Sequence, residues 1–112
     1  MHTPQNNLYD TATNNLQNTY KLEPEQIERL LQVSIKSLNE SLTVTEQALD
    51  SSDLIEMRRA VHKTKGTLLG LGLMAESDLA KEIEHSLRSG KTMDYRLLLN
   101  NLRKRIHPLL AA

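Results

Sequence analysis

The residues of this chain whose types and spacing best suit chemistry lie in one short segment near its middle. If that segment is helical, the neighbours of His62 one turn away are Arg58, Arg59, Lys65 and Gly66, so the imidazole faces water. An unperturbed imidazole is substantially neutral at about pH 7, which leaves a ring nitrogen free to act as a nucleophile. Lys65 could hold the oxygens of an arriving anion, and Gly66 removes a Cβ beside the ring. This arrangement suits phosphoryl transfer onto nitrogen, which depends on positioning and charge neutralisation.

The same spacing also fits a solvated surface histidine, which is the more common case on a helix. A mid-helix glycine costs about 0.5–1 kcal/mol relative to alanine, and room for a partner beside His62 is one compensation that would explain Gly66. His85 has no second histidine or cysteine at metal-ligand spacing, so we expect no metal site. The basic run 103–105 has no aromatic platform, and we interpret it as complementing a helix C-terminus and expect no nucleic-acid partner.

The helices that position these residues are predicted by the spacing of apolar side chains. Pro24 suits a first helical position, and Asp53 with Glu56 three residues later forms a variant of the capping box. After Leu22, apolar residues recur at spacings of three and four, which is typical of amphipathic helices. We expect helices over 24–50, 54–69 and 75–89, and a fourth from Thr92 or Asp94 onward. The predicted buried stripe of the second helix is Leu54, Met57, Val61, Thr64 and Leu68.

Four amphipathic helices joined by short turns predict an all-α fold, an antiparallel up-and-down four-helix bundle over residues 22–112. Residues 1–21 differ from the rest, because Asn, Gln and Thr dominate and apolar residues are scattered without a sustained period. Such a segment buries little surface, so we expect a flexible N-terminal arm or one short, weakly held helix.

Composition restricts the classes of function. Of 112 residues, 38% are hydrophobic and none is Phe, Trp or Cys, so the core is aliphatic and disulfides, cysteine zinc sites and thiol catalysis are excluded. Fourteen basic and fourteen acidic residues cancel to +0, which argues against nucleic-acid binding through bulk charge. No apolar run approaches the roughly 18 residues of a membrane span, and the first residues lack the apolar core of a signal peptide. We therefore expect a cytoplasmic protein without membrane association.

A longer pattern surrounds His62. Its residues are His62-x-x-Lys65-Gly66, Leu71-Gly72, Leu79, Ile83-Glu84 and Gly90, with Ala48-Leu49 and Asp53 upstream. This pattern resembles the histidine-containing phosphotransfer (HPt) domain. The resemblance runs from about Glu25 to the C-terminus, and the family fold is a four-helix bundle, in agreement with the periodicity.

The resemblance implies a role for individual residues. His62 matches the phosphorylated histidine, Lys65 the lysine that interacts with the phosphoryl group, and Gly66 the glycine that leaves space around the ring. Gly72 matches the glycine that closes the turn after the histidine helix, and Arg88 falls where some members place a second basic residue beside the histidine.

Two residues depart from the family pattern. Glu76 stands at a position that is usually apolar, and Val61 stands where Ala is common just before the histidine. Glu76 leaves open how the third helix begins, with Leu73 or Met74 as alternatives for the core contact.

The function that the resemblance implies is that of a phosphorelay intermediate. His62 would accept a phosphoryl group from the aspartate of a response-regulator receiver domain, or from a hybrid histidine kinase, and pass it to another receiver. The chain would be a phosphocarrier without ATPase or kinase activity and without a cofactor of its own, because the receiver would bring the Mg²⁺. Arg58, Arg59, Leu69 and Arg88 are the candidate binding residues, on a shallow patch that we expect to be apolar around Leu69 and Leu71. We expect a monomer that docks transiently.

Two other functions compete with this hypothesis. A non-catalytic docking module for a receiver or kinase would have little reason to place His62, Lys65 and Gly66 together on one exposed face. The dimerisation and histidine domain of a sensor kinase is disfavoured, because the acidic residue and the Arg-x-Pro that usually follow its histidine are absent. The native mass separates these classes, since an obligate dimer would favour the kinase-like domain.

Overall fold

The computed structural model describes residues 7–111, which form five helices and no strand, so the prediction of an all-α chain is confirmed for this part. Helices α2 to α5 begin and end close to the predicted positions. The helices are α1 (Asn7–Tyr20), α2 (Pro24–Asp50), α3 (Leu54–Gly70), α4 (Met74–Arg88) and α5 (Tyr95–Leu110).

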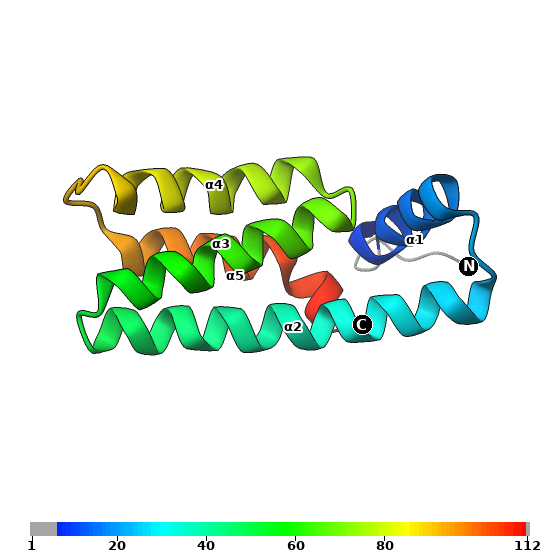
Figure 1. Cartoon of the computed structure of the whole chain (residues 1–112), viewed down its shortest axis with the longest axis horizontal. Helices are drawn as coiled ribbons and strands as arrows, with labels where there is room; N and C mark the ends of the chain where they lie inside the picture. Colours follow the sequence, from blue (N-terminus) through cyan, green and yellow to red (C-terminus); the bar gives the residue numbers. More distant parts are fainter. Residues whose placement is uncertain (1–6, 112) are drawn as a thin grey trace.

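Helices α2 to α5 lie side by side along the long axis of the molecule, and consecutive members run in opposite directions (Figure 1). Helix α3 packs against α2 and α4, and α5 packs against the same two helices, so the four enclose one aliphatic core. Large side chains that are fully buried in it include Leu38, Leu42, Met57, Leu68, Ile83, Leu99, Leu102 and Ile106.

The predicted start signals are found at two helices. Helix α2 begins at Pro24, and the side chain of Gln26 accepts a hydrogen bond from the Glu23 N–H at 3.0 Å. Helix α3 follows Asp53, whose carboxylate accepts from the Glu56 N–H at 3.1 Å. This cap satisfies a backbone donor that has no partner within the helix, and it fixes where α3 begins.

The predicted buried stripe of α3 is wrong at one residue. Leu54 is the first residue of the helix and is 54% exposed, because the first turn lies at the end of the molecule, where little of the neighbouring helices covers it. Ala60 is buried instead, beside Met57, Val61, Thr64 and Leu68. Because these residues face the core, the side of α3 that carries His62 faces solvent.

The described part of the N-terminal segment, residues 7–20, is helical and forms α1; residues 1–6 lie outside the described residues. Ala12 and Leu16 of α1 are buried in the same core as the other helices. The domain boundary after residue 21 stays a prediction.

Asn15 anchors α1 on the turn between α3 and α4. Its side-chain amide donates to the carbonyl oxygens of Leu71 and Gly72, both at 3.1 Å. Gly72 has a φ of +71°, and a Cβ at this position would lie 2.6 Å from the Asn15 amide nitrogen. Glycine is therefore required both by the backbone conformation and by the close approach of α1.

The beginning of α4 follows one of the two alternatives that Glu76 left open. Leu73 is buried and supplies the core contact, whereas Met74 is exposed. Glu76 is itself buried, and its carboxylate accepts a hydrogen bond from the Arg105 Nε of α5 at 3.0 Å. An ion pair thus occupies a position that an apolar side chain could fill.

Candidate functional site

His62 lies on the outer side of α3, with 64% of its side chain exposed. Its Nδ1 is 2.5 Å from Oε2 of Glu84, which α4 places opposite the middle of α3. The contact joins two residues 22 positions apart, and the extensive packing of α3 against α4 brings them together. One edge of the imidazole is therefore fixed by the protein, while the ring as a whole remains open to solvent.

Glu84 is the buried centre of this site, with only 5% of its side chain exposed. Its Oε1 accepts a hydrogen bond from the Lys65 Nζ at 2.8 Å, and an Arg88 guanidinium nitrogen lies 3.7 Å from its Oε2. Burial raises the pKa of the Glu84 carboxyl, but the hydrogen bonds from Lys65 and His62 and the charge of Lys65 outweigh burial and hold the pKa below its ordinary value of 4.5. Glu84 is thus an ionised acceptor at neutral pH.

The ionised carboxylate selects the tautomer of His62. A carboxylate only accepts hydrogen bonds, so the proton of the neutral imidazole must be on Nδ1, and Nε2 keeps its lone pair. Nε2 has no hydrogen-bond partner in the part of the chain that the structure describes. The site therefore presents an oriented nitrogen nucleophile whose opposite ring nitrogen is held by a buried negative charge.

A surface hollow of about 330 Å³ lies beside the ring. Arg58, Arg59 and Arg88 line it together with Ile55, His62 and Glu84, so cationic side chains surround the only carboxylate of the hollow. Arg59 forms an ion pair with Glu56 at 3.3 Å, whereas Arg58 makes no ion pair or side-chain hydrogen bond within residues 7–111. Positive charge therefore predominates in the hollow, as the binding of an anion would require.

Apolar side chains lie on the same side of α3 as His62. Leu69 follows His62 by two helical turns and is 50% exposed, and Ile55 precedes it by two turns and is also exposed. Leu71 contributes nothing to this surface, because it is buried. A Cβ added to Gly66 would meet no atom within 4 Å, so packing within the described chain does not require glycine there.

The structure thus brings most of the predicted residues together. His62, Lys65 and Arg88 all contact Glu84. Arg58 and Arg59 line the adjoining hollow. Gly66 and Leu69 follow on the same side of α3. The placement of Lys65 differs from the simplest expectation, since its ammonium is hydrogen bonded to Glu84.

Glu84 is part of the family pattern in the sequence, but sequence reasoning assigned it no function. A signal was available, because Glu84 shares the spacing of Ala80, Ile83 and Leu87 on the apolar side of α4. A carboxylate at such a position is buried and needs cationic partners. Lys65 and His62 on the facing helix are the partners that it finds.

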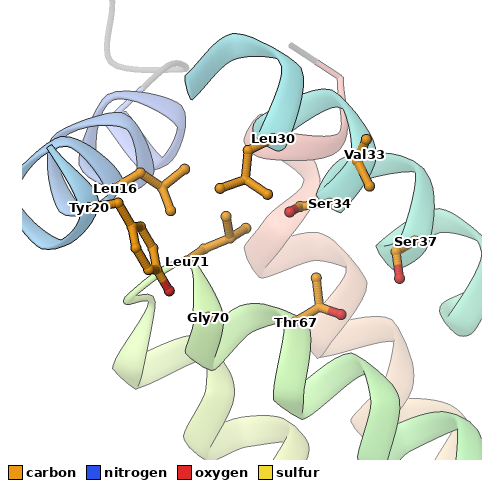
Figure 2. A pocket seen from close by; sticks show the side chains of 9 residues that line it. All are labelled: Leu16, Tyr20, Leu30, Val33, Ser34, Ser37, Thr67, Gly70 and Leu71. Carbon is orange, nitrogen blue, oxygen red and sulfur yellow. The ribbon is translucent and has the colours of Figure 1, made fainter. Parts of the chain in front are cut away.

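Other parts of the described chain offer less chemistry. Figure 2 shows a second hollow, of about 310 Å³, bounded by α1, α2 and the C-terminal end of α3, and no acidic, basic or histidine side chain lines it. Within residues 7–111 there is no group of three or more potential metal ligands, and no helix is long and apolar enough to cross a membrane. Two arginines of the run 103–105 form ion pairs with other helices, Arg103 with Glu46 and Arg105 with Glu76.

Comparison with known proteins agrees with this site. Residues 29–112 match the family described as the Hpt domain, and this range contains the histidine, the lysine and the glutamate of the site. No match was found among curated proteins or among solved structures. Because the match covers most of the chain, the protein belongs to the Hpt domain family, whose members take part in histidine phosphotransfer in phosphorelays.

Proposed function

We propose that this protein is a phosphorelay intermediate in which Nε2 of His62 accepts a phosphoryl group from the aspartyl phosphate of a receiver domain and passes it to the aspartate of another. The observation that carries the proposal is the exposed imidazole whose Nδ1 is hydrogen bonded to the buried carboxylate of Glu84. This contact leaves Nε2 as the open nucleophile, at the edge of a hollow lined by arginines.

The bonds and charges of the transfer step can be accounted for with the groups that the site and the receiver provide. The lone pair of Nε2 attacks phosphorus, the bond between phosphorus and the aspartyl oxygen breaks, and the aspartate leaves as a carboxylate. The proton on Nδ1 stays in place, so the imidazole ring gains a positive charge. Glu84, 2.5 Å from Nδ1, stabilises that charge as it develops. In the onward step the aspartate of the next receiver attacks phosphorus, the bond between phosphorus and Nε2 breaks, and the ring becomes neutral again.

The remaining catalytic groups would come from the partner. The receiver would supply Mg²⁺, which neutralises charge on the phosphoryl oxygens. This chain contributes the oriented nucleophile and the surface on which the receiver docks, and it needs no ATPase or kinase activity for that role. We interpret α2 to α5 as the up-and-down four-helix bundle that holds α3 and α4 in fixed register.

The docking surface would centre on His62. Exposed Ile55 and Leu69 on either side of it provide apolar area, while Arg58 and Arg59 provide charge at the rim. We expect the partner to bind transiently, because it has to leave after it has exchanged the phosphoryl group. We expect the protein itself to be a monomer.

Transfer from labelled receivers tests the proposal. Receiver domains encoded in the same genome are charged with ³²P-labelled acetyl phosphate and mixed with the wild-type chain, His62→Gln or His85→Gln. His85 is a matched control, because it is an exposed histidine on α4 away from the hollow. We expect label to pass from at least one receiver to the wild type and to His85→Gln but not to His62→Gln. Equal labelling of His62→Gln, or binding of receivers without any transfer, would overturn the proposal; the second result would favour a docking module.

A further inference from the structure

The ammonium group of Lys65, one turn after His62, is already paired with a carboxylate. The Lys65 Nζ donates to Glu84 Oε1 at 2.8 Å, and its side chain is only 23% exposed. A contact between this ammonium and a phosphoryl group on Nε2 would compete with its hydrogen bond to a carboxylate that is buried and ionised. Leaving a buried charge without its partner is costly, so Lys65 is better placed to balance Glu84 than to hold the transferred group.

The open cation of the site is Arg58. It precedes His62 by one helical turn, so the two side chains project from the same side of α3. Both residues line the hollow of about 330 Å³, whereas Lys65 is not among its lining residues. Of the three arginines there, Arg59 is paired with Glu56 and Arg88 lies 3.7 Å from Glu84, but Arg58 has no such partner in the described chain.

We propose that Arg58 is the main ligand of the phosphoryl group on His62, with Arg88 as its second, and that Lys65 acts through Glu84 as a positioning residue. This inference rests on the proposed function. The planar guanidinium of Arg58 can donate two hydrogen bonds to two phosphoryl oxygens, a geometry that an ammonium cannot offer. Arg88 is held at 3.7 Å by Glu84, a long contact that it can exchange for a dianion next to it.

The equilibrium of transfer distinguishes a phosphoryl ligand from a docking residue. A residue that only helps the receiver to dock changes the forward and reverse rates equally, so it leaves the final distribution of label unchanged. A residue that holds the phosphoryl group stabilises the phosphorylated chain alone, and its loss moves label back to the receiver. The experiment therefore measures the ratio of labelled chain to labelled receiver at equilibrium, with a receiver that transfers to the wild type.

We expect Arg58→Gln to shift this ratio about tenfold toward the receiver, Arg88→Gln to shift it less, and Arg58→Lys to recover part of the loss. Lys65→Gln should shift it less than Arg58→Gln. Lys63→Gln is the matched control, since Lys63 is an exposed cation on α3 that lines a different hollow. Circular dichroism confirms that each variant is folded, which the exposed position of Arg58 favours.

The outcomes separate this inference from the proposed function. If the wild type carries label on His62 and Arg58→Gln leaves the ratio unchanged, the role of Arg58 is wrong and the proposed function stands. A large shift with Lys65→Gln and none with Arg58→Gln would show that Lys65, and not Arg58, is the main ligand of the phosphoryl group. If the wild type accepts no label on His62, both proposals fail.

Discussion

Glu84 on α4 lies 2.5 Å from Nδ1 of His62 on α3, so a buried carboxylate holds one side of an exposed imidazole. The relationship explains how a surface histidine acquires a defined tautomer without being buried itself. It also links the reactivity of α3 to the register of α4, because a shift of either helix would separate the two groups. The packing of α3 against α4 therefore positions the reactive ring through this hydrogen bond.

Replacing the carboxylate of Glu84 with an amide should slow transfer without unfolding the chain. Glu84→Gln keeps the size of the side chain but cannot stabilise the positive charge that the ring gains, so we expect the transfer rate from a receiver to fall about 10- to 100-fold. Single-turnover transfer kinetics measure this. Glu82→Gln is the control, since Glu82 is exposed on the same helix, and its rate should stay at the wild-type value. Equal rates for the two variants would show that Glu84 is not needed.

The stability of the protein should depend on pH through the same residue. The pKa of Glu84 is held below its ordinary value of 4.5, chiefly because the hydrogen bonds from Lys65 and His62 outweigh burial. The folded state therefore favours the ionised form: the stabilisation is fully present above the ordinary pKa and is lost as pH falls through the lowered pKa. We expect the difference in unfolding free energy between the wild type and Glu84→Gln to be constant near neutral pH and to shrink below about pH 4.5.

Urea unfolding of both proteins over an acid pH series measures this difference, and the titration of groups that do not contact Glu84 cancels to first order. A difference that grows as the pH falls would contradict the depressed pKa.

Gly66→Ala should raise the stability of the protein but slow phosphoryl transfer. A Cβ at Gly66 meets no atom of the described chain within 4 Å, so removing a mid-helix glycine should raise stability by about 0.5–1 kcal/mol. The added methyl group projects from the docking side of α3, and we expect slower transfer. Gly70→Ala is the matched control, because its Cβ also meets open space and it lies at the end of the same helix. Transfer by Gly66→Ala at the wild-type rate would show that the partner does not need this space.

The ion pair between Glu76 and Arg105 should affect stability but not transfer. Arg105→Ala leaves the buried Glu76 carboxylate without its partner, and we expect a loss of about 1–3 kcal/mol in the free energy of unfolding. Combining it with Glu76→Leu should restore most of the loss, because an apolar side chain needs no partner there. Thermal unfolding measures both, with Lys104→Ala as the exposed control. A double variant no more stable than Arg105→Ala alone would contradict this account.

Much of the fold could be predicted from local patterns in the sequence. The beginnings of α2 and α3 follow from Pro24 at the first helical position and from Asp53 at the N-cap, and both signals depend only on residues within one turn. The direction in which His62 faces follows from the same local periodicity. The burial of α1 could not be predicted in this way, because Ala12 and Leu16 are too few to set a period and are held by contacts with distant residues.

The site was predictable only in part, and for a related reason. The residues of α3 could be grouped by their spacing around His62, but the hydrogen bond to Glu84 crosses between two helices and depends on their packing. The direction of the Lys65 ammonium depends on the same packing. Sequence spacing indicates that a lysine lies one turn from the histidine, and only the position of Glu84 determines which anion the lysine binds.

The measurement that tests this account most directly is the identity of the phosphorylated atom. The chain is labelled with ¹⁵N in its histidines, phosphorylated by a charged receiver domain, and examined by ¹⁵N and ³¹P NMR. We predict one phosphoryl group bonded to Nε2 of His62, with the proton retained on Nδ1 toward Glu84. A phosphoryl group on Nδ1 of His62, or on any other residue, would contradict the account.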